Sequence, residues 1–446
     1  MAIEIMWSLL GAIALSSQIK QEAIRIPISV LSSLSSPIIL AQETPTKDPD
    51  ADSAVKALLS SLKRAGYNVA SQGVWIQTTN GTMLAEYNGT KPLPAASLTK
   101  IATTLAALET WGTNYQFVTK IATTGKVVGN TLQGDLIIYG SNDPLFVWEE
   151  AIAVGNALNR LGINQVQGNL IVTKGFYMNF ESSPKLTTGY LRRGINAKTW
   201  TSEITKAYKS ISEDLPKPQV TIRGKSLYIP SVSTPTTILI EHSSLPMWQI
   251  LKRMNTFSNN DMAEILASSL GGGRAIAQKV GATIGLASEI RLINGSGLGQ
   301  QNQISPRANV SMLIAIQNLA QAQGLSLADL FPSRECRCGT IKDRNLPLGT
   351  IAKTGTLSDV SSLSGIFQTR DRGTIWFAIL NRGAGDLDIF HQVQDRVLLR
   401  LTQKWGLQKI ESGSSTFPSL PTFKAIPWQG SDRNKIISPT NSLLTN

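Results

Sequence analysis

The chain has 446 residues, a length that favours two or three domains over a single core. Its 42 lysines and arginines exceed its 30 acidic residues, which gives a formal net charge of +12. The basic residues are scattered without interleaved aromatics, a pattern that argues against nucleic-acid binding. The positive net charge is then explained either by a solvated basic surface or by peripheral contact with an anionic membrane or polymer.

The N-terminal region contains two apolar stretches, residues 6–16 and 26–40, separated by a short polar run. Each is shorter than the roughly 20 apolar residues of a membrane span. The second ends at Ala41, which fits a cleavage edge, so an export signal is favoured over an uncleaved anchor or a buried helix. A polar, proline-containing linker follows. Residues 1–53 are therefore expected to precede a folded domain that begins near Ala54 in the periplasm or cell envelope.

Residues 54–112 carry a helical pattern, then a hairpin, then a second helix that opens at Ser97. Asn80-Gly81 between two apolar runs is the strongest hairpin signal. Residues 113–241 change to short strands and turns, which predicts a β-rich inserted domain with one helix over 148–161.

Helical and strand patterns alternate again after residue 242. The expected helices are 246–255, 261–269, 273–284, 306–320 and 389–405, and the expected strands are 349–353, 360–368 and 373–380. Residues 54–112 and 242–410 together predict a mixed α/β catalytic domain, built from both ends of the chain and interrupted by the insert. Residues 411–446 are rich in Ser, Pro and Thr and predict a flexible tail.

Ser97 and Lys100 form the first candidate chemical pair. Residues i and i+3 share a helix face, so the lysine amine can approach the serine hydroxyl. A helix N-terminus also supplies free N–H groups and a positive potential that favour an ionised oxygen. A serine needs a base of this kind to act as a nucleophile. Alone, the pair is better explained by a capping serine beside a solvated lysine.

Two further motifs follow in the order helix start, loop and strand. Ser258-Asn259-Asn260 precedes a predicted helix, where the plain alternative is a cap made by Ser258 or Asn260. Lys353-Thr354-Gly355 ends an apolar run, and a glycine in an exposed strand fits close approach of another backbone. The three motifs together indicate one site.

Ser97-x-x-Lys100, Ser258-x-Asn260 and Lys353-Thr354-Gly355 resemble the motifs of the penicillin-recognising serine enzymes. Within these, the chain is similar to the D-alanyl-D-alanine carboxypeptidase/endopeptidase family, the low-molecular-mass penicillin-binding proteins whose catalytic domain is split by a large insert. Supporting stretches are 134–136, 142–144 and 294–298. The resemblance implies a penicillin-binding, β-lactamase-like transpeptidase fold, an antiparallel sheet with flanking helices.

The resemblance also implies roles. Ser97 would form the acyl-enzyme with Lys100 as base, Ser258 would relay a proton, and Asn260 would anchor the substrate peptide. Lys353 and Thr354 would bind the terminal carboxylate, beside Gly355, and the backbone N–H groups of Ser97 and Thr356 would form the oxyanion hole. Clustering would lower the pKa of both lysines. The scheme requires no metal or organic cofactor; its partners are peptidoglycan stem peptides, with β-lactams as covalent inhibitors.

The chain departs from the family at Gln300, where an arginine is common, and at Ser358, where the family can carry a larger polar residue. Recognition of the stem-peptide side chain therefore stays open. The alternative functions are a β-lactamase or transpeptidase on the same scaffold, and a non-catalytic peptidoglycan or penicillin sensor.

Five other residues complete the candidates. Cys336 and Cys338 are separated by one residue, which makes a strain-free disulfide difficult, so two free thiols in a loop are expected. His242 and His391, the only histidines, are interpreted as surface or packing residues. Asp143 either lines the substrate groove or caps its loop.

Overall fold

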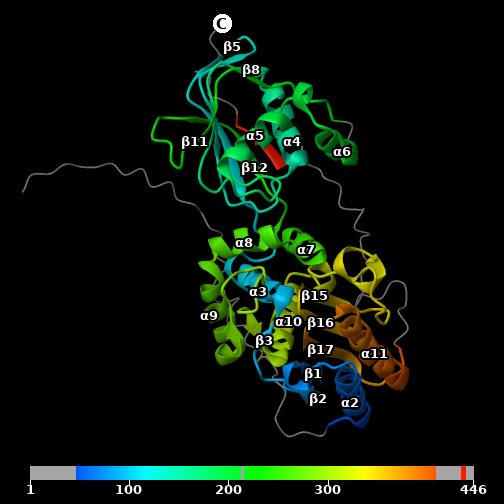
Figure 1. The fold of residues 1–446 in the computed structure, drawn as a ribbon. Coiled ribbons are helices and arrows are strands. Elements are labelled where there is room, and N and C mark those ends of the chain that lie inside the picture. The colour runs from blue at the N-terminus through cyan, green and yellow to red at the C-terminus, as the bar shows by residue number, and fades with distance from the viewer. Residues whose placement is uncertain (1–46, 212–214, 408–432, 438–446) are drawn as a thin grey trace, which may run out of the picture. The chain divides into compact units, whose positions relative to one another are not determined.

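A five-stranded antiparallel sheet is built from segments near both ends of the chain (Figure 1). The computed structural model describes residues 47–211, 215–407 and 433–437. The strand order is β15-β16-β17-β1-β2. The strands are β1 Gly73–Thr78, β2 Met83–Tyr87, β15 Ile351–Leu357, β16 Val360–Thr369 and β17 Gly373–Arg382. The predicted hairpin and the three late strands are thereby confirmed, and β1 lies directly beside β17.

Helices cover both faces of this sheet, as expected for the predicted fold class (Figure 1). On one face α2 (Pro49–Arg64) and α11 (Leu387–Trp405) pack together, and their apolar side chains form a core with those of the strands. On the other face α10 (Pro306–Gln321) packs against β17 and β1, and α3 (Thr99–Trp111) packs against α10. Further helices are α7 Met247–Phe257, α8 Asn260–Ser269 and α9 Gly272–Ile284.

Short elements connect these helices to the sheet. A small three-stranded sheet is formed by β3 Leu93–Pro94, β13 Ile290–Arg291 and β14 Gln303–Ile304. The 3-10 turns are η1 Val69–Ser71, η2 Ala96–Leu98, η3 Ala197–Thr199, η4 Ala287–Glu289, η5 Leu327–Asp329, η6 Arg334–Cys336 and η7 Gly339–Ile341. The turn η2 leads directly into α3 and carries the candidate nucleophile Ser97.

The inserted segment has two sheets and a core of its own. Its strands are β4 Val118–Thr123, β5 Lys126–Val128, β6 Thr131–Gln133, β7 Leu136–Tyr139, β8 Gln165–Val166, β9 Leu170–Val172, β10 Thr221–Ile222, β11 Ser226–Tyr228 and β12 Thr237–Ser243. Its helices are α4 Trp148–Arg160, α5 Pro184–Gly194 and α6 Ser202–Ser210. Only α4 was predicted. The helix α6 does carry an apolar stripe, with Ile204 in the core of the insert and Ala207 and Tyr208 packed against it, so its sequence pattern was overlooked.

The predicted linker is too long at its C-terminal end. Helix α2 begins at Pro49, and the buried Asp48 caps it by accepting hydrogen bonds from the backbone of Asp50 and Ala51. Asp48 also forms a 2.7 Å ion pair with Arg372. An acidic cap followed by proline is a helix-start signal, so the folded part begins before Ala54.

The prediction of a flexible tail over 411–446 is wrong for residues 433–437. Strand β18 (Asn434–Ile436) pairs antiparallel with β12 and adds a sixth strand to the order β11-β9-β7-β4-β12-β18. The rest of the predicted tail, and the predicted export signal, lie outside the described residues. Among the helices that the structure describes, none has both the length and the apolarity needed to cross a membrane.

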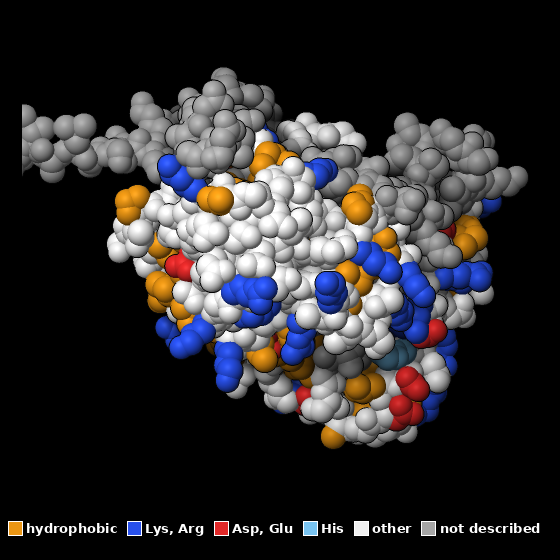
Figure 2. Space-filling model, turned by 90° about the horizontal axis from the view of Figure 1, so that it is seen from above, with side chains coloured by type: hydrophobic (Ala, Val, Ile, Leu, Met, Phe, Trp, Pro, Cys, Tyr) orange, Lys and Arg blue, Asp and Glu red, His pale blue; other side chains and the backbone are white. Residues whose placement is uncertain are grey.

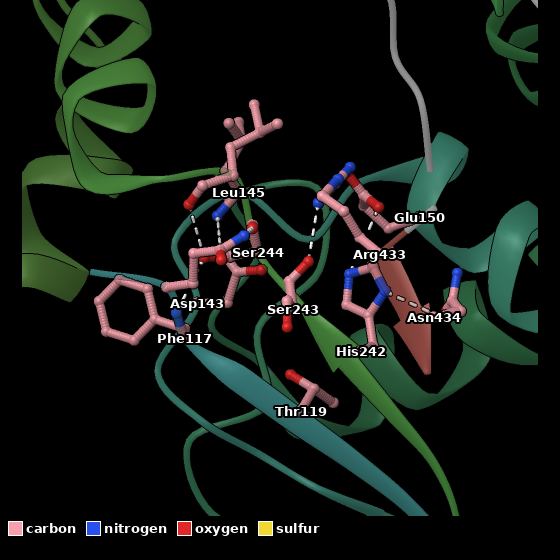
Figure 3. Close-up of polar contacts among 12 residues, drawn as sticks. Phe117, Thr119, Asp143, Leu145, Glu150, His242, Ser243, Ser244, Arg433 and Asn434 are labelled. Atoms are coloured by element: carbon pink, nitrogen blue, oxygen red, sulfur yellow. Dashed lines mark hydrogen bonds and ion pairs between the residues drawn. The ribbon is translucent and has the colours of Figure 1, made fainter. Parts of the chain in front are cut away.

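A buried polar cluster joins β12, α4 and the C-terminal strand (Figure 3). His242 is fully buried, its Nδ1 lies 3.0 Å from Asn434 Oδ1, and its Nε2 lies 3.3 Å from a carboxylate oxygen of Glu150. Asp143 is buried nearby and accepts a 2.8 Å hydrogen bond from the backbone of Leu145. His242 is thus a packing residue as predicted, and Asp143 caps its loop.

Basic side chains do not gather on the face seen from above in Figure 2. Lysines and arginines are spread over it with uncharged side chains between them. This distribution matches the scattered basic residues of the sequence and gives no continuous track for a nucleic-acid backbone.

Candidate active site

Ser97 lies at the entrance of α3, on the short turn η2. The residue before it, Ala96, has a φ of 48°, a left-handed conformation that is uncommon outside glycine. This sharp turn places the Ser97 side chain in a pocket, and Lys100 follows in the first turn of α3. The Lys100 Nζ lies 3.0 Å from Ser97 Oγ, so the spacing predicted from the sequence does bring the two groups together.

Lys100 has three oxygen neighbours at hydrogen-bond distance. Besides Ser97 Oγ, its Nζ donates to Asn260 Oδ1 at 2.8 Å and to the backbone carbonyl of Ser296 at 2.7 Å. Burial lowers the pKa of Lys100 to about 7, although Glu264 and Asp261 act in the opposite direction. A neutral amine has two hydrogens and one lone pair. Because two of its neighbours are carbonyl oxygens that only accept, the lone pair is left to face the serine hydroxyl.

The loop between α7 and α8 brings Ser258 and Asn260 to the same pocket. Ser258 ends α7 in a left-handed conformation, with a φ of 54°, and its hydroxyl accepts a 2.9 Å hydrogen bond from Lys353 Nζ. The helix cap is made by Asn259, which accepts from Met262 N, and this leaves the Asn260 side chain to bind Lys100. The alternative of a cap at Ser258 or Asn260 is therefore wrong.

Lys353 is fully buried on β15, and its side chain contacts Ser258 on the loop between α7 and α8. Its Nζ donates to Ser258 Oγ and, at 2.6 Å, to the backbone carbonyl of Thr354. Burial, and secondarily the charge of Lys100, hold the pKa of Lys353 well below its ordinary value. The expected effect of one lysine on the other is thus present at Lys353, where burial is the larger cause, whereas the lowered pKa of Lys100 is caused by burial.

Gly355 permits β15 to lie against the turn that carries Ser97. A Cβ at this position would stand 2.9 Å from Ser97 N, 2.8 Å from the Ala95 carbonyl and 2.3 Å from Ser362 Oγ. The first two contacts are with backbone, which cannot rotate away. The close approach that the glycine motif predicted is therefore between the strand and the nucleophile turn.

We expect Gly355→Ala to lower the acylation rate of Ser97 by roughly tenfold or more, because the added methyl displaces the nucleophile's backbone. The rate of labelling by a fluorescent penicillin measures this. Gly373→Ala is a suitable comparison, since a Cβ there meets nothing within 4 Å, although its positive φ costs some stability. Equal labelling rates for the two variants would contradict the role given to Gly355.

Glu264 organises the loop that supplies the Ser296 carbonyl. Its carboxylate accepts hydrogen bonds from the backbone N–H groups of Gly295 (3.3 Å) and Ser296 (2.9 Å). Gly297, with a φ of +89°, then passes over Ala96, where a Cβ would stand 1.9 Å from the Ala96 carbonyl. Glu264 thus fixes an acceptor for Lys100, and the sequence offered no signal for it beyond the stretch 294–298.

The pocket collects residues from five parts of the chain. Its lining consists of Ser97, Ser258, Asn260, Thr340, Arg344, Thr354, Thr356 and His391. None of these is acidic. Of the predicted site residues, Lys100, Lys353 and Gly355 lie behind this lining and contact it.

Three lining residues were not predicted as site residues. Thr340 accepts a 2.6 Å hydrogen bond from the Thr354 hydroxyl, and Arg344 is held by Asp395. His391 is half-buried on α11 and lines the pocket, where the sequence predicted only a surface or packing residue. Thr340 and Arg344 lie on the loop shortly before Lys353, and His391 lies on α11; no local pattern marks the three as site residues.

Gln300, where the family commonly has arginine, belongs to a surface cluster. Its side-chain amide donates to both carboxylate oxygens of Asp359 at 2.9 Å, and its Oε1 accepts from Arg382 at 2.6 Å. Arg382 in turn pairs with Asp359 at 3.1 Å. The Gln300 amide thus bridges the Asp359 carboxylate and the Arg382 guanidinium, which also form an ion pair with each other.

Cys336 and Cys338 form a disulfide, which corrects the expectation of two free thiols. The intervening Arg337 adopts a left-handed conformation with a φ of 43°, and this brings the two Cα atoms to 5.1 Å. The spacing argument failed because it assumed extended backbone between the cysteines.

The bond closes only a three-residue loop, so its reduction is expected to lower the free energy of unfolding by merely about 1.6 kcal/mol. Thermal melts of the protein with and without a phosphine reductant measure this. A change in melting temperature of more than about 10 °C would contradict a purely local effect. The Cys336→Ser/Cys338→Ser double variant should melt like the reduced protein.

Comparison with known proteins places the site in a family. The sequence profile of the D-Ala-D-Ala carboxypeptidase 3 (S13) family matches residues 55–190 and 193–403. The D-alanyl-D-alanine carboxypeptidase DacB of Haemophilus influenzae is 23% identical over 394 residues, 65% of this chain and 80% of the relative. The D-alanyl-D-alanine carboxypeptidase of an Actinomadura species is 33% identical over 192 residues, 39% of this chain and 35% of the relative.

Solved structures have the same fold. A penicillin G-acylated predatory endopeptidase from Bdellovibrio bacteriovorus is 25% identical with a TM-score of 0.65, covering 76% of this chain and 94% of the neighbour. Penicillin binding protein 4 from Haemophilus influenzae is 20% identical with a TM-score of 0.57, covering 78% and 99%. The predicted fold and the predicted family are confirmed. Since the profile spans most of its length, the chain belongs to the D-Ala-D-Ala carboxypeptidase 3 (S13) family.

Proposed function

We propose that the chain is a serine D-Ala-D-Ala carboxypeptidase, with DD-endopeptidase activity on the same site, that trims peptidoglycan stem peptides through an acyl-enzyme on Ser97. The observation that carries the proposal is the Lys100 amine, 3.0 Å from Ser97 Oγ, with its other two contacts made to carbonyl oxygens. A pKa of about 7 leaves much of this amine neutral at neutral pH, as a general base requires.

Acylation follows from these positions. Lys100 takes the proton of Ser97 as Oγ attacks the carbonyl carbon of the penultimate D-Ala. The negative oxygen is stabilised by the backbone N–H groups of Ser97 and Thr356, two residues that line the pocket. Ser258, hydrogen-bonded to Lys353, passes its proton to the departing amine as the C–N bond breaks and receives in exchange the proton that Lys100 took from Ser97, so that Lys100 is neutral again for deacylation. Asn260 holds the amide of the substrate while also accepting from Lys100.

Deacylation completes the cycle. Water attacks the ester carbonyl, Lys100 takes one of its protons, and the Ser97 oxygen leaves with a proton returned from the lysine. A β-lactam enters the same steps but keeps its amine tethered, which fits its action as a covalent inhibitor. The penicillin G adduct of the Bdellovibrio endopeptidase, at 25% identity, supports this expectation.

The location in the periplasm or cell envelope is part of the proposal. It is supported by the signal-like apolar stretch that ends near Ala41 and by the peptidoglycan substrate itself. Peripheral contact with an anionic membrane surface, suggested by the net charge of +12, also stays a proposal.

Incubation with purified muropeptides tests the proposed reaction. Release of free D-alanine from pentapeptide monomers is expected, together with slower cleavage of cross-linked dimers, and Ser97→Ala should release neither. Rapid turnover of penicillin without D-alanine release would instead identify a β-lactamase. Formation of new cross-links would identify a transpeptidase, and absence of every reaction a sensor.

A further inference from the structure

One wall of the pocket is formed by the turn η7, which follows the Cys336–Cys338 disulfide directly in the chain. Its residue Thr340 lines the pocket. The turn contacts α7, the helix capped by Ser258, and β15, the strand that carries Lys353. The disulfide therefore precedes a segment that is braced between two parts of the catalytic machinery.

These contacts leave η7 little freedom to shift. Gly339 lies so close to the end of α7 that a Cβ would stand 1.9 Å from the backbone carbonyl of Thr256, two residues before Ser258. On the other side, Thr340 accepts a 2.6 Å hydrogen bond from the Thr354 hydroxyl of β15. A displacement of η7 would therefore move the residues around Ser258, break the contact with β15, or do both.

The disulfide sets the direction in which the chain enters η7. Arg337 has a φ of 43°, a left-handed conformation that is sterically disfavoured for a residue with a Cβ. The bond between its two neighbours holds their Cα atoms 5.1 Å apart and so keeps Arg337 in this conformation. When the bond is broken, Arg337 is free to leave the left-handed region, and the chain then enters Gly339 along a different path.

An anchor at each end of the loop confines the effect of reduction. Before the cysteines, the backbone N–H of Arg334 donates to the Thr350 carbonyl at 2.8 Å. After them, Arg344 forms a buried 2.6 Å ion pair with Asp395. Because the disulfide closes only a three-residue loop, its loss leaves these anchors and the fold in place. The segment that responds is the one between the anchors, which includes Thr340.

The disulfide is placed where a reductant can reach it. Both cysteines are half-buried, and the residue between them, Arg337, is exposed. Cys336 stands between Arg334 and Arg337 in the chain, while the carboxylate of Glu335 accepts a hydrogen bond from the backbone of Gly349. Positive neighbours stabilise the thiolate that is released when a disulfide is attacked. Disulfides that are accessible to solvent are the labile ones.

We propose that Cys336–Cys338 is a redox modification site, which a dithiol reductant opens by thiol–disulfide exchange and whose oxidised form holds η7 in the position that acylation requires. One thiolate of the reductant attacks a cysteine sulfur, the S–S bond breaks, and a mixed disulfide forms. The second thiolate of the reductant attacks its own sulfur in that mixed disulfide and releases the cysteine. The protein gains two electrons and two protons, and the reductant leaves as a disulfide. The inference rests on the proposed function of the pocket.

Native protein treated with dithiothreitol, and then freed of it by gel filtration, tests the proposal. Iodoacetamide should label both cysteines of the treated protein and neither of the untreated protein. We expect reduction to lower the second-order rate constant for labelling of Ser97 by a fluorescent penicillin roughly tenfold, and reoxidation with diamide to restore it. The Cys336→Ser/Cys338→Ser double variant should have the rate constant of the reduced protein before and after dithiothreitol. This rate constant does not depend on the fraction of active protein.

A matched pair of glycine variants tests the step from the disulfide to the pocket. Gly339 and Gly324 both have a positive φ, 60° and 71°, so alanine costs backbone energy at either position. Only at Gly339 does the new methyl collide with the α7 backbone, since a Cβ at Gly324 meets nothing within 4 Å. Gly339→Ala should therefore lower the rate constant of the oxidised protein toward that of the reduced protein, and Gly324→Ala should leave it unchanged.

Three results would overturn the inference: a disulfide that dithiothreitol opens only in the unfolded protein, a fully reduced protein that is acylated at the oxidised rate, or a double variant that still responds to dithiothreitol. Equal rate constants for Gly339→Ala and Gly324→Ala would overturn the role of η7. An oxidised wild type that no penicillin labels is a different result, because it would contradict the proposed function, whereas the iodoacetamide count still reports the exchange.

Discussion

Replacing Lys100 with methionine is expected to lower the acylation rate of Ser97 by roughly 10³-fold or more, the largest kinetic effect that the site predicts. The methionine side chain fills much of the same space, but its thioether sulfur is far too weak a base to take the serine proton. Three contacts are lost at once, to Ser97, Asn260 and Ser296. The second-order rate constant for labelling by a fluorescent penicillin measures the change. A loss of less than tenfold would contradict the role of Lys100 as base.

The same lysine sets the pH dependence. Its pKa is lowered to about 7 by burial, and the amine acts in its deprotonated form, so the acylation rate should rise with pH up to about 7 and level off above it. Asp261 raises this pKa. Asp261→Asn should therefore move the rising limb to lower pH while leaving the plateau in place. A limb that does not move, or moves to higher pH, would contradict this electrostatic account.

Replacing Arg433 with methionine is expected to reduce the free energy of unfolding by about 3 to 5 kcal/mol, although this residue lies far from the pocket motifs in sequence. Arg433 Nη2 donates to Glu150, a carboxylate that is 1% exposed, and its Nη1 donates to the Ser243 carbonyl at 2.9 Å (Figure 3). The variant leaves the buried carboxylate without this ion pair. Urea unfolding measures the loss.

The pH dependence of that loss has a definite sign. Burial lowers the pKa of His242, and Arg433 lowers it further, while Glu150 raises it. Removing Arg433 therefore raises this pKa. At a pH below the His242 pKa of the variant, protonated His242 pairs with Glu150 in place of the arginine. This stabilisation disappears as the pH rises through that pKa. The destabilisation should thus be smaller near about pH 5 than near about pH 8.

A matched control separates this buried pair from surface charge. Arg370→Met removes an arginine whose side chain is 71% exposed and which pairs with the adjacent Asp371 at 2.7 Å. Its effect on the free energy of unfolding should be far smaller than that of Arg433→Met, because both members of the pair are exposed to solvent. Similar losses for Arg370→Met and Arg433→Met would show that the buried cluster contributes no more than a surface pair.

The parts of the site that are predictable from the sequence are those set by local backbone geometry. The spacing of Ser97 and Lys100 places the hydroxyl and the amine on the same face of a helix, whatever the surrounding residues are. The glycine of Lys353-Thr354-Gly355 predicts a close approach between two backbone segments. In the structure these segments are β15 and the turn that carries Ser97. Strands β16 and β17 have ten residues each, and β17 contains a continuous apolar run, so their pattern stands out as well.

The missing parts depend on tertiary contacts that no local pattern encodes. His391 enters the pocket because α11 packs on the sheet, and Arg344 does so because Asp395 of the same helix holds it. Strand β18 has three residues and gains its conformation from pairing with β12. The disulfide depends on a left-handed Arg337, a conformation that the residue type does not favour.

The claim that Ser97 is an acylated nucleophile is tested most directly by intact-protein mass spectrometry after incubation with benzylpenicillin, followed by peptide mapping of the adduct. The account predicts one penicilloyl group per chain, located on the peptide that contains Ser97, and no adduct on Ser97→Ala. An adduct on another residue, an adduct that persists in Ser97→Ala, or an unmodified wild type would contradict it.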